Sequence, residues 1–148
     1  MSTLRRATRD DLAPIVALQR AAYAKNRVIL GVEPLPLMAD YAEIFARYEF
    51  YVADGPHALD GVLILEPRAD DLLIWSVATA PAAQGRGIGN MLLAFAESRA
   101  RALGLTCIRL YTGETLTANI AWYRRHGYQH ERVEDMGDRR VVHLIKQL

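Results

Sequence analysis

Several features are scarce or missing in this sequence, and each absence excludes a class of protein. A single cysteine, Cys107, excludes an intrachain disulfide, and its apolar neighbours favour buried packing over nucleophilic chemistry. The net charge of +1 gives no long-range attraction to nucleic acid or to an anionic membrane. No apolar run approaches the ~20 residues that cross a bilayer, and residues 1–6 lack the apolar region of a signal peptide. We therefore expect a cytoplasmic protein with no nucleic-acid or membrane partner.

The composition is that of an ordinary folded domain. Hydrophobic residues make up 51% of the 148 residues and charged residues 24%. This length suits one domain with one core, so we expect residues 1–148 to form a single unit. His126 and His130 are four residues apart, but Gly127 breaks the helix between them. A paired metal site is therefore not expected, and we expect no metal.

The pattern of apolar residues predicts an α/β fold. Central strands are expected at 72–78, which is almost wholly apolar, and at 105–111, and the helix between them makes these two strands parallel neighbours. Segment 25–37, with one glycine and two prolines, is expected to be a loop. The remaining expected strands are 3–7, 50–53, 58–65, 128–134 and 140–146, and the remaining expected helices are 8–24, 39–48 and 115–126.

The most informative segment runs from Val77 to Leu93, where an apolar strand passes through small residues into a helical pattern. Three glycines, at positions 85, 87 and 89, lie where the helix begins. Glycine lets backbone N–H groups approach a ligand, and the free amides of a new helix suit an anion, most often phosphate. The segment therefore predicts a phosphate-binding turn.

Three phosphate-binding motifs can be compared with this turn. A nucleoside-triphosphate loop requires Gly-Lys, a dipeptide that the sequence lacks. A dinucleotide fingerprint requires a third glycine where Asn90 stands, and only Glu114 could serve as its ribose carboxylate. The third pattern, Gln-x-x-Gly-x-Gly from Gln84 to Gly89, resembles the acyl-CoA pyrophosphate loop of the GNAT-type N-acetyltransferases.

A second motif, on the last expected helix, resembles the same family. Asn119 and Tyr123 are four residues apart and so share one helix face, and Gly127-Tyr128 follows them. The GNAT pattern likewise has Asn, then Tyr four residues on, then Gly-Phe or Gly-Tyr. The order of elements also matches, so the resemblance covers essentially the whole chain. It implies an α/β fold with a mixed, mostly antiparallel sheet flanked by helices, and acetyl-CoA bound between the strands at 72–78 and 105–111.

The resemblance also implies roles for individual residues. Tyr123 would be the general acid that protonates the departing thiolate, and Asn119 would hold the pantetheine arm. A backbone N–H, by register that of Val77, would polarise the thioester carbonyl. Arg124 and Arg125 would either meet CoA phosphates or form a solvated face. The expected cofactor-binding residues are Val77, Ala78, Thr79, Gln84, Gly85, Arg86, Gly87, Ile88, Gly89, Asn90 and Asn119.

The sequence departs from the family at the general base. Many members carry a glutamate in the strand before the loop, but the corresponding position is about Leu73, and 72–77 contains no ionisable side chain. The base is open between Glu33, Asp40, Glu114, an ordered water, and no base at all if the amine arrives neutral.

The predicted function is direct transfer of an acetyl group from acetyl-CoA to a primary amine of a small molecule or peptide. Two alternatives remain, a non-catalytic acyl-CoA-binding module and a transferase that uses a longer acyl-CoA. Residues 25–41 are expected to border the acceptor, and either a monomer or a homodimer is compatible with the sequence.

Overall fold

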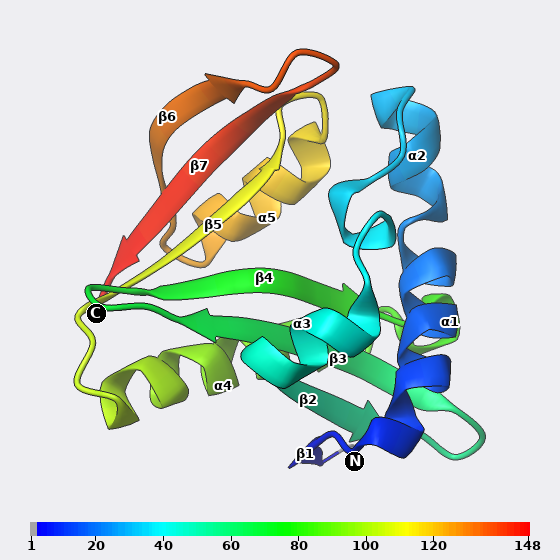
Figure 1. Cartoon of the computed structure of the whole chain (residues 1–148). Coiled ribbons are helices and arrows are strands. Elements are labelled where there is room, and N and C mark those ends of the chain that lie inside the picture. The colour runs from blue at the N-terminus through cyan, green and yellow to red at the C-terminus, as the bar shows by residue number, and fades with distance from the viewer. Residues whose placement is uncertain (1–2) are drawn as a thin grey trace.

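A seven-stranded mixed sheet forms the centre of the molecule (Figure 1). A computed structural model describes residues 3–148. The strands lie in the order β1-β2-β3-β4-β5-β7-β6, and every neighbouring pair is antiparallel except β4 and β5. Their bounds are β1 Leu4–Arg6, β2 Glu49–Asp54, β3 Leu59–Pro67, β4 Leu72–Thr79, β5 Cys107–Gly113, β6 Gln129–Asp135 and β7 Arg140–Gln147. The predicted α/β class and mostly antiparallel sheet are confirmed.

Helices cover both faces of the sheet. Helices α1 and α3 bury apolar residues against one face, and α4 and α5 pack against the other. The bounds are α1 Leu12–Ala22, α2 Ala24–Leu30, α3 Tyr41–Arg47, α4 Ile88–Ala102 and α5 Thr117–Arg125, with short 3-10 turns at Arg9–Asp11, Leu35–Leu37 and Pro81–Ala83. Glycines with positive φ follow α4 and α5, Gly104 at +75° and Gly127 at +94°, the left-handed conformation with which helices commonly end.

The prediction of a loop over 25–37 is wrong in its first half. Helix α2 occupies this stretch because the run from Ala24 to Leu30 contains neither glycine nor proline. Gly31, with φ +72°, ends the helix, and Pro34 and Pro36 follow. The apolar side chains of this stretch form no buried stripe that would indicate a helix, and Val28, for example, is 82% exposed. Between α2 and α3, residues 31–40 lie outside the α-helices, and they include the 3-10 turn at Leu35–Leu37.

Strands β4 and β5 are parallel neighbours, as predicted, but they stay together for only a short distance. Their pairing is restricted to Leu72 with Ile108 and Leu73 with Arg109. Beyond these pairs the two strands separate toward their carboxyl ends (Figure 1). Each strand remains paired on its other side, β4 with β3 and β5 with β7. The carboxyl half of β4 therefore has one edge without a neighbouring strand.

A β-bulge in β4 determines which side chains enter this opening. Ile74 pairs with Leu65 and Ser76 pairs with Ile64, so Trp75 is an extra residue in β4. Before the bulge, Ile74 lies in the core beneath α4. After it, Ser76 faces the α1 side of the sheet, and Val77 returns to the α4 side.

Candidate functional site

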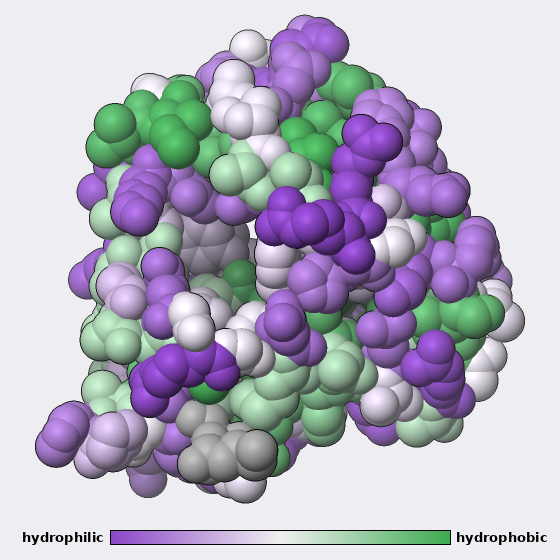
Figure 2. Space-filling model, turned by 180° about the vertical axis from the view of Figure 1, so that it is seen from behind, coloured by the Kyte–Doolittle hydropathy of each residue, from purple (hydrophilic) through white to green (hydrophobic). Residues whose placement is uncertain are grey.

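The separation of β4 and β5 opens a cavity of about 840 Å³. Its walls come from the carboxyl halves of both strands, the turn before α4, helix α5, helix α2 with the segment that follows it, and the turn that leads into β7. Seen from behind, it is a hollow in the surface beside the hydrophobic patch of α2 (Figure 2). Residues that are far apart in the sequence therefore converge on one space.

The glycine turn contributes free backbone donors to this cavity. Gly85 and Gly87 have φ values of +81° and +79°, and α4 begins immediately afterwards at Ile88. No side chain caps this end of α4. The first amides of a helix have no partner within the helix, so those of the first turn can bind an anion. A Cβ built on Gly85 or Gly87 would meet no atom, so it is the backbone conformation that requires glycine there.

Gly89 serves a different purpose, because it allows α5 to pack closely on α4. A Cβ at this position would lie 3.0 Å from the Trp122 ring. His126, also at the end of α5, adds a polar link. Its Nδ1 lies 2.9 Å from the Trp122 carbonyl oxygen, and its Nε2 lies 2.9 Å from the side-chain amide of Asn90. The side chain of Asn90 is therefore engaged with α5, and its backbone remains available to a ligand in the cavity.

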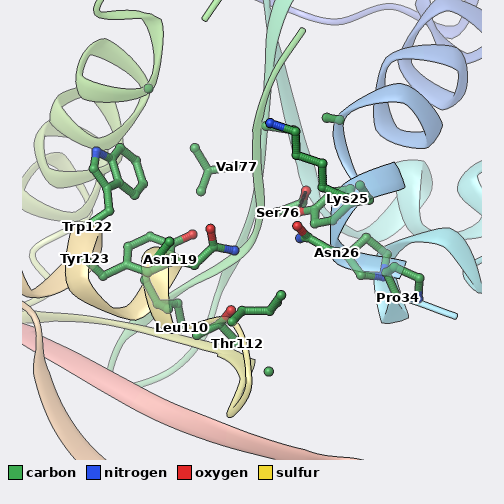
Figure 3. Close-up of a pocket in the computed structure, with 18 of the residues that line it drawn as sticks. Lys25, Asn26, Pro34, Ser76, Val77, Leu110, Thr112, Asn119, Trp122 and Tyr123 are labelled. Atoms are coloured by element: carbon green, nitrogen blue, oxygen red, sulfur yellow. Dashed lines mark hydrogen bonds between the residues drawn. The ribbon is translucent and has the colours of Figure 1, made fainter. Parts of the chain in front are cut away.

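Helix α5 presents Asn119 and Tyr123 to the cavity from adjacent turns. Figure 3 shows the Tyr123 hydroxyl directed toward Asn119 and the space in front of Val77. The Tyr123 ring packs edge-on against Tyr128, with centroids 5.8 Å apart. Burial raises the pKa of the Tyr123 phenol above its usual value, and Tyr23 across the cavity adds to this effect. The phenol is therefore protonated at neutral pH.

A buried polar network that the sequence did not reveal forms the opposite wall. Gln19 Nε2 donates to Ser76 Oγ at 2.8 Å and to the Tyr41 hydroxyl at 3.1 Å. Ser76 Oγ in turn lies 3.0 Å from the Tyr23 hydroxyl, and both of these residues line the cavity. The only signal in the sequence is the amide of Gln19 within the apolar face of the first helix.

The three carboxylates considered as a base are engaged outside the cavity lining. Glu33 pairs with Arg27 at 2.8 Å, and Glu114 pairs with Arg140 at 3.2 Å. Asp40 caps α3 by accepting from the Glu43 amide. Among residues 3–148, the lining contains no aspartate and no glutamate.

The structure brings almost all of the sequence-predicted site residues together. Those lining the cavity are Val77, Ala78, Thr79, Gln84, Gly85, Gly87, Ile88, Gly89, Asn90, Asn119 and Tyr123. Arg86 is not among the lining residues, and its guanidinium lies 3.4 Å from Asp60. Arg124 and Arg125 are exposed on α5 and are also outside the lining. The residues missed by the sequence analysis are Gln19, Tyr23, Ser76 and Arg139.

In the described part of the chain, no three His, Cys, Asp or Glu residues are grouped so that they could hold a metal ion. None of the helices within residues 3–148 is both long and apolar enough to cross a membrane.

Comparisons with known proteins show the family to which the chain belongs. Residues 46–130 match the family model described as an acetyltransferase (GNAT) domain. An amino-acid acetyltransferase of Ralstonia nicotianae is 32% identical over 143 residues. That alignment covers 95% of this chain but only 29% of the Ralstonia protein, so the chain spans less than a third of that relative's length.

Solved structures share the fold over their whole length. The ribosomal-protein-S18-alanine N-acetyltransferase of Escherichia coli has a TM-score of 0.79 at 16% identity, covering 99% of this chain and 94% of that one. A GNAT family acetyltransferase of Elizabethkingia anophelis with acetyl-CoA bound has a TM-score of 0.76 at 18% identity, covering 99% and 98%. At such identities the likeness concerns the fold.

Proposed function

Because the chain belongs to the GNAT acetyltransferase family, we propose that it transfers an acetyl group from acetyl-CoA to a primary amine, with residues 1–148 as one catalytic domain. The observation that carries this proposal is the convergence of three features on one cavity. These are the glycine turn at the start of α4, the open edge of β4, and the Asn119–Tyr123 face of α5.

The cavity has the features that an acyl-CoA would need. The free amides of α4 suit the pyrophosphate, and Gly85 and Gly87 keep side chains away from it. The open edge of β4, from Ile74 onward, offers backbone N–H and C=O groups to the amides of the pantetheine arm, as a sheet edge does to a peptide. The solved relative from Elizabethkingia holds acetyl-CoA, which supports the same donor here.

In the proposed reaction, the acceptor nitrogen attacks the thioester carbonyl carbon, the new C–N bond forms, and the C–S bond then breaks. The N–H of Val77 stabilises the oxyanion. The Tyr123 phenol donates a hydrogen bond to the departing sulfur, which becomes a thiol by taking up a proton while the attacking nitrogen loses one. The raised pKa of Tyr123 keeps the phenol protonated for this role.

The acceptor nitrogen attacks only as a neutral amine. Since the described lining holds no carboxylate, the deprotonation falls to water or occurs before binding. The surrounding cations Lys25 and Arg139 also disfavour an ammonium ion in the cavity. The relative named an amino-acid acetyltransferase supports an amine as the acceptor.

Release of free thiol from acetyl-CoA in the presence of a panel of amines tests the proposal. We expect acceptor-dependent thiol release and an acetylated amine of the corresponding mass. Tight binding of acetyl-CoA without transfer to any amine would instead indicate a non-catalytic acyl-CoA-binding module. Preference for a longer acyl-CoA over acetyl-CoA would correct the donor.

A further inference from the structure

The charged side chains of the cavity lining all carry a positive charge. Among the described residues, its only side chains with a full charge at neutral pH are Lys25 and Arg139. Both lie on the side away from the glycine turn, on α2 and on the turn between β6 and β7. The acceptor end of the cavity is therefore positive, although the whole chain carries only +1.

Lys25 projects from the first turn of α2 into the space in front of β4 (Figure 3). It is exposed, and its side chain has neither an ion pair within 4 Å nor a hydrogen bond to another described residue. An extended lysine at a cavity wall places a mobile ammonium next to any bound molecule.

Arg139 is held rigidly in the opposite wall. Its side chain is only 7% exposed, and its Nη1 donates to the Glu33 carbonyl oxygen at 2.6 Å. Nε and Nη2 donate to Asp138, whose carboxylate is 59% exposed and lies outside the lining. Because solvent screens that carboxylate, and because Nη1 carries a second hydrogen, Arg139 can still donate to an anion in the cavity.

We propose that the amine acceptor carries a carboxylate, which Lys25 and Arg139 bind while its amino group faces the thioester near Val77 and Tyr123. This inference rests on the proposed function and specifies its acceptor. Apolar residues of the same lining, including Ile29, Leu30 and Pro34, would contact the uncharged body of the molecule. The acceptor class is thus an amino acid or a similar small amino carboxylate.

Matched acceptors provide the test. Thiol release is measured with L-leucine, L-phenylalanine and L-methionine, each beside its α-carboxamide and its decarboxylated amine. We expect kcat/KM to be about ten- to a hundredfold higher for the carboxylates, the range for one or two hydrogen bonds to a charged group. Equal or better use of the amides and amines would overturn the inference and leave the proposed function intact. Absence of transfer to every amine would overturn both.

Variants then connect the preference to the two cations. Lys25→Met should raise KM for the carboxylates about tenfold, leave the amides unaffected and preserve kcat, while Lys25→Arg should restore most of the preference. Arg139→Gln should act in the same direction.

Arg20→Met is the control, because Arg20 is an exposed cation on α1 outside the lining. An unchanged preference in both the Lys25→Met and Arg139→Gln variants would refute the assignment. So would a fall in CoA affinity equal to the loss of rate, because the cations would then bind the donor.

Discussion

Tyr123 and Tyr128 stack edge-on, yet only Tyr123 lines the cavity, and the hydroxyl of Tyr128 is buried with no hydrogen-bond partner. Tyr123→Phe should lower kcat about 10²- to 10⁴-fold, the usual effect of losing a general acid. CoA affinity should change little, because the expected phosphate and pantetheine contacts lie elsewhere. Tyr128→Phe makes the same chemical change next to it and should retain turnover. Turnover and CoA affinity, measured on the same preparation of each variant, show whether Tyr123 acts as a proton donor or only as a packing residue.

Asp11 shows how a single residue can make stability depend on pH. Its carboxylate binds Arg5 through two contacts of 2.9 Å and accepts from the Thr8 amide at 2.7 Å. Chiefly because of Arg5, the pKa of Asp11 falls from 3.8 to about 2. The stabilisation is therefore complete above pH 4 and is lost as the pH falls through 2.

Asp11→Asn should cost up to about 1 kcal/mol in unfolding free energy at pH 6, because the amide can still accept from the Thr8 N–H but loses the ion pair with Arg5. The cost should shrink as the pH falls through 2, where the wild-type carboxylate itself becomes protonated. Urea titrations at several pH values measure it, with Asp10→Asn as the control, since Asp10 is exposed and adjacent. A cost that does not vary with pH would show that the pairing with Arg5 contributes nothing.

At the residue scale, sequence reasoning found the contacts that depend on local spacing. Asn119 and Tyr123 share a helix face by virtue of their four-residue separation, and the glycine turn is continuous in sequence. Ser76 and Gln19 are 57 residues apart, and Arg139 reaches the Glu33 carbonyl across 106 residues. Such contacts depend on how the elements pack, which no local pattern encodes.

At the scale of elements, the beginning of α4 is the feature most open to test. Gly87→Asp would add a negative charge among the amides that face the cavity, and like charges would repel the CoA phosphates. We expect CoA affinity to fall about ten- to a hundredfold, from loss of one or two charge-assisted hydrogen bonds. Isothermal titration calorimetry on the folded variant measures this.

The other end of the same helix supplies the control. Gly104 has φ +75°, close to the +79° of Gly87, and a side chain at either position meets open space. Gly104→Asp therefore introduces a similar backbone strain and the same charge far from the turn. It should retain CoA affinity. Equal losses in both variants would mean that strain, and not the local anion site, explains the effect.

Helix α2 was the element that the sequence misjudged, and the reason is physical. Helices are recognised by an apolar stripe, but α2 has no buried residue, and Val28 and Ile29 face solvent. The parallel pairing of β4 with β5 was predictable from the intervening helix, whereas its restriction to two residue pairs was not. That divergence depends on the packing of whole elements.

At the scale of the whole molecule, the cavity separates two groups of strands, β1 to β4 and β5 to β7. A ligand that contacts both groups binds only the folded state and so should raise the melting temperature. At a CoA concentration 100 times Kd, the gain is about 2.7 kcal/mol. For a chain of this length, that corresponds to a rise of roughly 5–10 °C.

Differential scanning calorimetry with and without CoA measures this rise. Tyr123→Phe should keep the shift, whereas Gly87→Asp should lose most of it. A wild-type melting temperature that does not respond to millimolar CoA would contradict binding in the cavity.

The bulge at Trp75 also limits how β4 can change length. Side chains alternate between the two faces of a strand. If one residue between Ser76 and Thr79 were deleted while the residues after it kept their positions, every residue of β4 before the deletion would move to the opposite face of the sheet. Val77 would then point toward α1, and Ser76 would lose Gln19 and Tyr23. Insertions and deletions in this stretch should therefore be tolerated in pairs but not singly. Only removal of Trp75 itself would leave a regular strand with every other residue on its present face, because Ile74 and Ser76 already lie on opposite faces.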